Sequence, residues 1–311
     1  MKGRAIRAWL AAFILCSGLA LAAPRPAARP IRALCTTYPI YLFTRAVCQG
    51  SPGVAAELML PSSLGCPHDY VMTPVDMRRL SEADLLVENG LGMEDFLEAP
   101  LRKARPRLGV VDSSAGISGL IRMSPEPGAA GGDHHHAGDF NPHLFASPRQ
   151  AARIVGVLAE NFARLDPARA ALYRKNAALF AARMNRLADE FKAAAAAFPN
   201  KRIVTQHAVF DYLARDSGLS IVAVVEEEPG QAPSAAGMLS IVREIREKKA
   251  AAVFTEPQYP AGVGKTVARE AGIPVAVLDP AANGPANAEP SYYEAAMREN
   301  LETLKKVLGR R

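Results

Sequence analysis

The residues of this chain best suited to chemistry are its histidines, of which the 311 residues include six. They form one consecutive run and three isolated positions: His134, His135 and His136, and His68, His143 and His207. Imidazole is the commonest protein ligand for zinc, and it is the side chain whose ordinary pKa lies nearest neutrality. So sparing a use of histidine favours metal binding, although a single isolated histidine is more often a hydrogen-bonded structural residue.

Three isolated histidines and one aspartate lie at the ends of predicted strands or turns. His68 is in a turn after one predicted strand, and His207 and Asp279 each directly follow another. His143 lies just ahead of a predicted helix start. Ligands of open α/β sheets bind beyond the carboxyl ends of the strands, so these four side chains are predicted to converge.

A set of three imidazoles and one carboxylate can complete a four-coordinate zinc site, with metal–ligand distances of about 2.0–2.2 Å. Manganese is a harder ion that prefers more oxygen ligands, so the third histidine favours zinc. Copper and nickel also accept imidazole, and the residues alone leave them open. Taken singly, Asp279 could be a turn or helix cap; the four residues together make a metal site the better prediction.

The rest of the chain predicts an α/β fold. Short apolar runs rich in β-branched residues alternate with helical patterns, which is typical of parallel sheets with crossover helices. The predicted strands share this composition and cover residues 31–36, 55–60, 83–88, 108–111, 202–205, 221–225, 251–255 and 275–278. Helix starts are indicated by a capping residue with a first-turn proline or acid, at Thr73–Asp76, Ser147–Pro148 and Ser291–Glu294.

One predicted helix is unusually long and covers residues 166–198. Its apolar positions recur at helical spacing: Leu172, Leu179, Phe180, Met184, Leu187, Phe191 and Phe198. At about 1.5 Å per residue it spans roughly 50 Å, which is longer than one small domain requires. We therefore expect two lobes, residues 24–165 and 199–311, joined by this helix. A coiled-coil partner is the rival interpretation, but the apolar positions do not keep a heptad.

The first 23 residues predict a secretory signal peptide, with a basic start, an apolar run from Trp9 to Leu21 and small residues at the end. A membrane helix needs about 20 apolar residues, and this run is shorter. The mature chain is thus expected outside the cytoplasm, without a membrane-spanning segment. A lipid anchor at Cys16 is less favoured, because Leu15 is bulky where lipoprotein processing sites have a small residue.

Cleavage of that segment would leave three cysteines, Cys35, Cys48 and Cys66, so at most one disulfide can form. Cys35 and Cys48 are close enough in sequence to pair if the chain turns back between them. The alternative is that both are small buried apolar residues.

Other function classes find little support. The net charge of +6 includes Lys2, Arg4 and Arg7 of the signal segment, and the remainder is too small to predict nucleic-acid binding. The segment 262–266 is similar to the end of a phosphate-binding loop, but Tyr259 stands where that motif needs glycine. The acidic run 226–228 is expected to be solvated surface. The HExxH and GxSxG motifs of hydrolases are absent.

Several segments together resemble one known family. GCPHDYVMTPVDMRRLSEADLLVENGLGMEDF, FNPHLFASPRQA, TQHAVFDYLARDSGL, EEEPGQAPSAA and VAVLDP occur in the order found in the zinc-binding periplasmic proteins of ABC importers, the cluster A-I metal-binding family. The resemblance covers nearly all of the mature chain. It implies two α/β lobes joined by a rigid backbone helix, a metal ion in the cleft between them, and delivery of that ion to a membrane permease.

The same resemblance assigns residues. The histidine ligands of the family map onto His68, His143 and His207, and the carboxylate ligand maps onto Asp279; manganese-binding relatives typically have Glu where this chain has His207. Zinc-binding members often carry a histidine-rich loop, which here is reduced to residues 134–136 within a loop of residues 125–139 that is expected to be mobile. These three histidines are candidate auxiliary metal ligands.

The sequence therefore predicts a monomeric, exported Zn²⁺-binding protein that serves an ABC-type permease and is not an enzyme. Two alternatives remain open. An exported zinc-dependent hydrolase would also use three protein ligands, although Asp279 would then fill the position that a catalytic zinc keeps for water. A manganese-binding or adhesin-type relative is the other.

Overall fold

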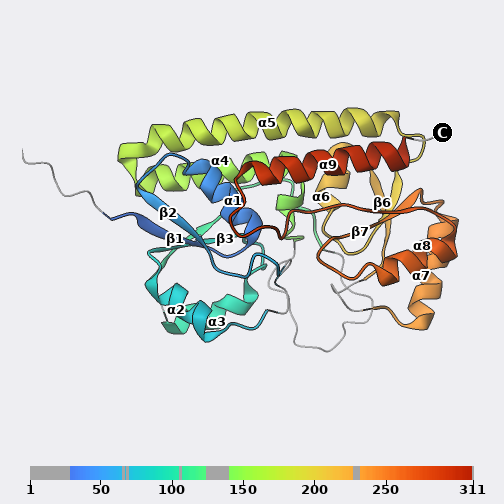
Figure 1. The fold of residues 1–311 in the computed structure, drawn as a ribbon, viewed down its shortest axis with the longest axis horizontal. Helices are drawn as coiled ribbons and strands as arrows, with labels where there is room; N and C mark the ends of the chain where they lie inside the picture. Colours follow the sequence, from blue (N-terminus) through green and yellow to red (C-terminus); the bar gives the residue numbers. More distant parts are fainter. Residues whose placement is uncertain are drawn as a thin grey trace, which may run out of the picture.

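The protein forms two similar α/β lobes that lie side by side (Figure 1). The computed structural model describes residues 29–64, 67, 70–104, 107–123, 140–226 and 232–309. The sheet of the first lobe has the order β2-β1-β3-β4, formed by β1 Ile31–Cys35, β2 Val54–Leu58, β3 Leu85–Glu88 and β4 Gly109–Asp112. That of the second lobe has the order β6-β5-β7-β8, formed by β5 Arg202–Thr205, β6 Ser220–Val224, β7 Ala252–Thr255 and β8 Val275–Val277.

Both sheets share one topology, in which the first strand of each lobe lies inside the sheet and pairs with two neighbours. Every pairing is parallel, so the carboxyl ends of all four strands of a lobe lie at one edge. All eight predicted strands are present with small shifts at their ends, and the predicted fold class is confirmed.

Helices lie on both sides of the first sheet, α1 Tyr38–Val47 and α4 Pro148–Leu165 on one side and α2 Pro74–Glu82 and α3 Asp95–Ala104 on the other (Figure 1). At the start of α2, the Thr73 hydroxyl accepts from the Asp76 backbone N–H while the Asp76 carboxylate accepts from the Thr73 N–H, which confirms the predicted cap. At α4, Ser147 takes the cap position, but its hydroxyl donates to Asp216 of the second lobe at 2.7 Å.

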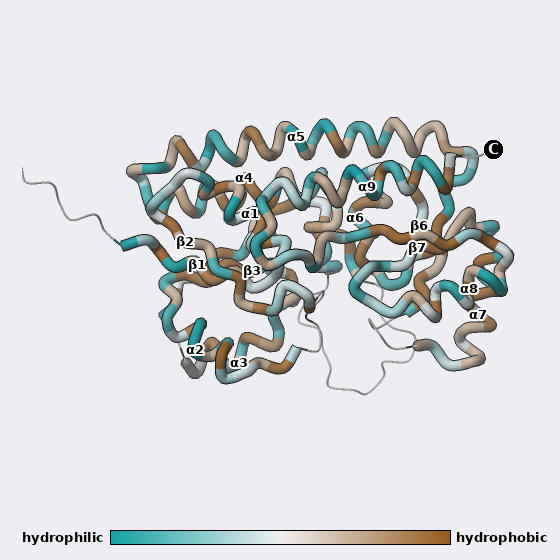
Figure 2. The backbone as a smooth tube through the Cα atoms, viewed as in Figure 1, coloured by the Kyte–Doolittle hydropathy of each residue, from teal (hydrophilic) through white to brown (hydrophobic). Residues whose placement is uncertain are grey.

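The predicted long helix is α5, Ala170–Ala197, preceded by a single 3₁₀ turn, η2 Pro167–Arg169. The helix begins later than expected because residues 167–169 form that turn. Asp166 takes the cap position of the turn, and its carboxylate accepts from the Tyr173 hydroxyl. α5 contacts α1 and α4 of the first lobe and α6 and α9 of the second, and Figure 1 shows it lying along both lobes. In Figure 2 the tube of α5 alternates between hydrophilic and hydrophobic residues along its length. Leu179, one of the apolar positions of the predicted pattern, is 54% exposed.

The second lobe contains α6 Asp211–Ser217, α7 Ala235–Glu247, α8 Gly262–Ala271 and α9 Ser291–Leu308. The segment 262–266, which is similar to the end of a phosphate-binding loop, forms the first residues of α8. Ser291 is the first helical residue of α9 and Pro290 takes the cap position, so the predicted Ser291 cap is wrong. Among the described residues, no helix has the length and apolar character needed to cross a membrane.

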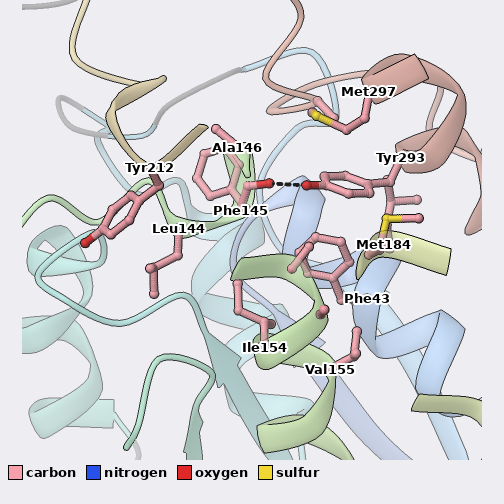
Figure 3. Packing of buried hydrophobic residues seen from close by; sticks show 14 of the residues in the cluster. Phe43, Leu144, Phe145, Ala146, Ile154, Val155, Met184, Tyr212, Tyr293 and Met297 are labelled. Atoms are coloured by element: carbon pink, nitrogen blue, oxygen red, sulfur yellow. Dashed lines mark hydrogen bonds between the residues drawn. The ribbon is translucent and has the colours of Figure 1, made fainter. Parts of the chain in front are cut away.

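The largest hydrophobic cluster contains residues from both lobes. Phe43 of α1, Phe180 of α5 and Tyr293 of α9 pack edge-on, with ring centroids 4.8 Å apart for Phe43 and Tyr293 and 5.7 Å for Phe43 and Phe180. The Tyr293 hydroxyl donates to the Phe145 carbonyl at 2.6 Å, as Figure 3 shows. Smaller clusters lie beneath α7 and α8 in the second lobe and beneath α2 and α3 in the first.

Cys35 and Cys48 are both buried and free. Burial raises the pKa of the Cys35 thiol to about 12 and raises that of Cys48 further. Of the two interpretations that the sequence left open, a disulfide or two small buried apolar residues, the second is confirmed for Cys35 and Cys48. Several predicted features lie outside the described residues: the signal segment 1–23 with Cys16, Cys66, His68, and the loop 125–139 with His134, His135 and His136.

Candidate metal centre

His207 is placed by β5, an inner strand of the second sheet. The strand ends at Thr205, and the next backbone N–H, that of Gln206, donates to the Phe254 carbonyl of β7 at 2.9 Å. His207 therefore leaves the carboxyl edge of the sheet at its centre, as predicted, and only 2% of it is exposed.

The nearest charged group to His207 is Glu256, which follows β7 as His207 follows β5. Nδ1 of His207 lies 2.5 Å from Oε1 of Glu256. The other carboxylate oxygen of Glu256 accepts from the Gln258 side chain at 2.6 Å. Burial raises the pKa of Glu256, and the contact with His207 opposes that rise, because a nearby N–H or positive charge favours the carboxylate.

His143 is held by a residue two positions before it. Both its backbone N–H and its Nδ1 lie 2.9 Å from Oδ1 of Asn141. The Asn141 amide nitrogen donates in turn to the Ala208 carbonyl at 2.8 Å and to the Asp211 carboxylate at 3.2 Å. His143 is 4% exposed and immediately precedes the 3₁₀ turn η1 Leu144–Ala146.

The structure brings these two predicted ligands together. The ring centroids of His143 and His207 are 5.4 Å apart, with the ring planes at 77°. The first residue comes before α5 in the chain and the second after it, so segments from both sides of the long helix meet here. The ring of Tyr259 also contacts His207, with centroids 5.6 Å apart.

Asp279 lies beyond β8, the edge strand of the second sheet. Its carboxylate accepts from the Ala281 N–H at 2.7 Å. The Asn300 side chain accepts from the backbone N–H of Asp279 and donates to its backbone carbonyl. Burial raises the pKa of Asp279, the Ala281 N–H opposes this, and Glu299 adds to the rise. Asp279 also lines a cavity of about 470 Å³ with Glu299, Asn300 and Lys306 of α9.

Within the part of the chain that the structure describes, no three His, Cys, Asp or Glu side chains are grouped so as to hold a metal ion. The structure thus pairs His143 with His207 but does not place Asp279 in a cluster with them. His68 is outside the described residues, so the complete four-residue set stays a prediction.

A contact nevertheless joins the segments that carry the other two predicted ligands. The backbone N–H of Gly284, which follows Asp279, donates at 2.9 Å to the carbonyl of Ser62, which precedes His68. The Tyr38 hydroxyl donates to the Pro285 carbonyl at 2.9 Å. A β-carbon on Gly284 would lie 2.6 Å from the Tyr38 oxygen, so this close approach needs glycine.

Sequence reasoning missed Glu256 and Asn141, and it misjudged Glu226. Glu256 follows the predicted strand 251–255, so the rule that selected His207 and Asp279 could have found it. Glu226, expected in a solvated acidic run, is 3% exposed and accepts from the Gln206 side chain at 3.3 Å. It is buried because its backbone N–H continues the pairing of β6 with the β5 segment, donating to the Gln206 carbonyl at 2.7 Å.

The chain is similar to known zinc-binding proteins. The chain is 30% identical over 281 residues to the high-affinity zinc uptake system protein ZnuA of Bacillus subtilis, covering 88% of this chain and 86% of the relative. It is 26% identical over 295 residues to the zinc-binding protein AdcA of Streptococcus pyogenes, again over 88% of this chain. The chain spans about half the length of such AdcA relatives, 55%.

Solved structures show the same architecture. The SBP FpvC of Pseudomonas aeruginosa in complex with Mn²⁺ superposes with a TM-score of 0.76 at 26% identity, covering 90% of this chain and 98% of that one. A crystal structure of ZnuA superposes with a TM-score of 0.73 at 25% identity, covering 89% and 99%. The family described as zinc-uptake complex component A, periplasmic, matches residues 34–307. With nearly the whole described fold inside that match, the chain belongs to the family of periplasmic zinc-uptake component A proteins.

Proposed function

We propose that this protein captures Zn²⁺ outside the cytoplasm and delivers it to the membrane permease of an ABC importer. The observation that carries the proposal is the buried pair His143 and His207, contributed by segments on either side of α5. Membership of the zinc-uptake family supports the choice of cargo, as do the names of the relatives in Bacillus subtilis and Streptococcus pyogenes.

The spacing of the two rings suits a shared ion. Two imidazoles that bind one tetrahedral zinc through Nε2, at about 2.1 Å each, have ring centroids about 5 Å apart. The centroids of His143 and His207 are 5.4 Å apart. We infer that these two rings bind the same ion, and that His68 and Asp279 complete its coordination.

The donor set favours zinc over manganese. With three imidazoles and one carboxylate, nitrogen ligands outnumber oxygen ligands, whereas manganese prefers oxygen. The similar FpvC structure holds Mn²⁺, so manganese is the competitor that a binding experiment must include. We further propose that His134, His135 and His136 are auxiliary and that the tight site does not need them.

The proposal also includes export of the protein and its docking on a membrane permease. Residues 1–23 would direct the chain to the periplasm, where it would act as a monomer and dock on the permease when loaded. Binding and release, with no catalysed reaction, is the proposed activity. If the zinc-loaded protein turned over esters, peptides or phosphates and lost that activity with a chelator, an exported hydrolase would be the better assignment.

The decisive experiment is competitive metal titration read by native mass spectrometry. Wild-type protein is expected to bind one Zn²⁺ per chain tightly and to prefer it to Mn²⁺. His143→Ala and His207→Ala should each weaken zinc binding by at least about 100-fold, because each removes an inner ligand, whereas loss of an outer-shell partner typically costs about 10–100-fold.

The control replaces His134, His135 and His136 together with alanine, which removes three imidazoles, more than either single variant, without touching the proposed site. This triple variant should bind zinc as tightly as the wild type. Loss of tight binding in the triple variant, or wild-type affinity in both single variants, would reverse the assignment of the two histidine groups.

A further inference from the structure

Two histidines of the proposed zinc site, His143 and His207, each have a side-chain oxygen against Nδ1, and the two oxygens come from residues outside the predicted ligand set. For His143 the oxygen is Oδ1 of Asn141, and for His207 it is Oε1 of Glu256. A histidine that binds a metal through Nε2 usually donates its other N–H to such an acceptor, which fixes the tautomer and the ring orientation.

The tautomer of His143 follows from the contacts of Asn141. The Ala208 carbonyl can only accept, so the end of the Asn141 amide that faces it at 2.8 Å must be the NH₂ group. The opposite end, the carbonyl oxygen, therefore faces His143 and can only accept. A proton must then sit on Nδ1 of His143, which leaves the lone pair on Nε2.

The contact with Glu256 favours one tautomer of His207. Nδ1 and the carboxylate oxygen are 2.5 Å apart, closer than two lone-pair-bearing atoms tolerate, although they are not aligned as in a regular hydrogen bond. A proton on Nδ1 relieves this repulsion. Two further hydrogen bonds hold Glu256 in place. Its second carboxylate oxygen accepts from the Gln258 side chain, and its backbone N–H donates to the side-chain oxygen of Gln206 at 3.1 Å. With that proton on Nδ1 and Glu256 ionised, the neutral His207 ring keeps its lone pair on Nε2.

Asn141 also joins the two rings to each other. Its oxygen contacts His143, while its nitrogen is bound to the carbonyl of Ala208, the residue next to His207. The backbone carbonyl of Asn141 accepts from the Tyr212 hydroxyl at 2.8 Å, so the residue is tied to α6 as well. The side-chain amide of Asn141 thus orients the His143 ring and connects it to the backbone next to His207.

We propose that Asn141 and Glu256 are the positioning residues of the metal centre: each accepts the Nδ1–H of one histidine, so that both rings present Nε2 to the same divalent cation before it arrives. The inference rests on the proposed zinc site, but the proton positions it predicts can be measured without zinc. Neither residue touches the ion.

The first test is nitrogen NMR of metal-free protein with ¹⁵N-labelled histidine, at a pH above about 8 where imidazoles are neutral. Six histidines give few signals, and the spectra of His143→Ala and His207→Ala assign the two of interest. Long-range proton–nitrogen correlations distinguish Nδ1–H from Nε2–H. We expect Nδ1–H at both rings; Nε2–H at either would overturn the proposal for that ring.

The second test uses Glu256→Ala and Glu256→Gln. Alanine removes the acceptor, so His207 should populate both tautomers and zinc should bind roughly 10–100-fold more weakly. Glutamine keeps an oxygen for Nδ1–H and should restore the tautomer and most of the affinity. Glu270→Ala is the control, since it removes a carboxylate of the same lobe whose side chain is 56% exposed. Unchanged affinity and tautomer in Glu256→Ala would refute the role of Glu256.

The third test compares Asn141→Asp with Asn141→Leu. Aspartate keeps an oxygen toward His143 but loses the donor to Ala208, whereas leucine loses both. Asp should preserve Nδ1–H at His143, and Leu should abolish the preference. If the Leu variant does not fold, as judged by circular dichroism, the wild-type spectrum alone decides the question for His143.

The two proposals fail in different ways. If the wild-type rings are Nδ1–H but the protein binds no zinc, the proposed function is wrong and the proton positions stand. If zinc binds tightly to a protein whose rings are Nε2–H when metal-free, the function stands and the positioning role is wrong.

Discussion

Buried carboxylates in this protein differ in what surrounds them. Glu256 contacts His207, but Glu94, 7% exposed, accepts from the Thr36 hydroxyl and from the backbone N–H groups of Asn89 and Gly90. Burial raises the pKa of Glu94 to about 8 despite these three donors. Nearby Glu88 has its pKa raised to about 7, first by burial and then by the charge of Asp112. Both groups therefore titrate in the folded protein above their ordinary value of 4.5.

This gives a prediction for the pH dependence of stability. Between about pH 4.5 and 7 the folded state binds more protons at Glu88 than the unfolded state, so the contribution of Glu88 to the free energy of unfolding falls as pH rises through that window. Glu88→Gln should remove this part of the fall, about 1–2 kcal/mol after allowance for the partial exposure of the group. Urea unfolding at pH 5 and pH 7.5 measures it.

The matched control for that experiment is Glu247→Gln, at an exposed position on α7. It should leave the difference between the two pH values unchanged. An equally steep fall in Glu88→Gln and in the wild type would show that Glu88 does not titrate in this range.

At the scale of elements, Gly284 and Gly156 differ in the space that surrounds them. Gly284 lies where the segment after Asp279 meets the first lobe, and a β-carbon there would collide with Tyr38 and Tyr292. Gly156 is exposed in the middle of α4, and a β-carbon there would meet nothing within 4 Å. The same substitution should therefore have opposite effects at the two sites.

Gly284→Ala should lower the free energy of unfolding by about 1–3 kcal/mol, as overpacking does. It should also weaken zinc binding, because the segment that follows Asp279 must shift away from Ser62. Gly156→Ala should raise stability by about 0.5–1 kcal/mol through helix propensity, with zinc affinity unchanged. Chemical denaturation and zinc titration of both variants check this; a neutral Gly284→Ala would mean that the two tyrosines yield easily.

At the scale of the whole molecule, the two lobes share one core. The cluster that contains Phe43, Phe180 and Tyr293 draws on α1, α5 and α9, and α5 contacts helices of both lobes. An ion pair also connects α5 to α9: the Arg183 guanidinium lies 3.0 Å from the Glu294 carboxylate. Because neither lobe buries its own face of this cluster without the other, the lobes should not unfold separately.

We therefore expect a single calorimetric unfolding transition, with the measured enthalpy equal to the van't Hoff enthalpy. Phe180→Ala should lower the stability of that one transition by about 3–5 kcal/mol, the usual range for removing a buried aromatic ring. Two resolved transitions, of which Phe180→Ala shifted only one, would show that each lobe is independently stable.

The sequence alone determined the features that depend on neighbours along the chain. Alternating apolar runs located all eight strands, Thr73 and Asp76 predicted the start of α2, and the strand-end rule placed His207 and Asp279 beyond β5 and β8. Local geometry and side-chain periodicity govern these features. Where the local signal was ambiguous, the predicted boundary was wrong: the cap of α9 is Pro290 and not Ser291, and α5 starts at Ala170 and not at residue 166.

Only the tertiary structure decided which side chains meet. Nothing in the spacing of His143 and His207 fixes their rings 5.4 Å apart, or brings Glu256 and Asn141 to their Nδ1 atoms. The burial of Glu226 and the absence of a bond between Cys35 and Cys48 depend likewise on how remote segments pack. Such contacts are set by the joint packing of helices and sheets across both lobes, where small changes in placement alter which groups touch, and that information is not contained in any local pattern.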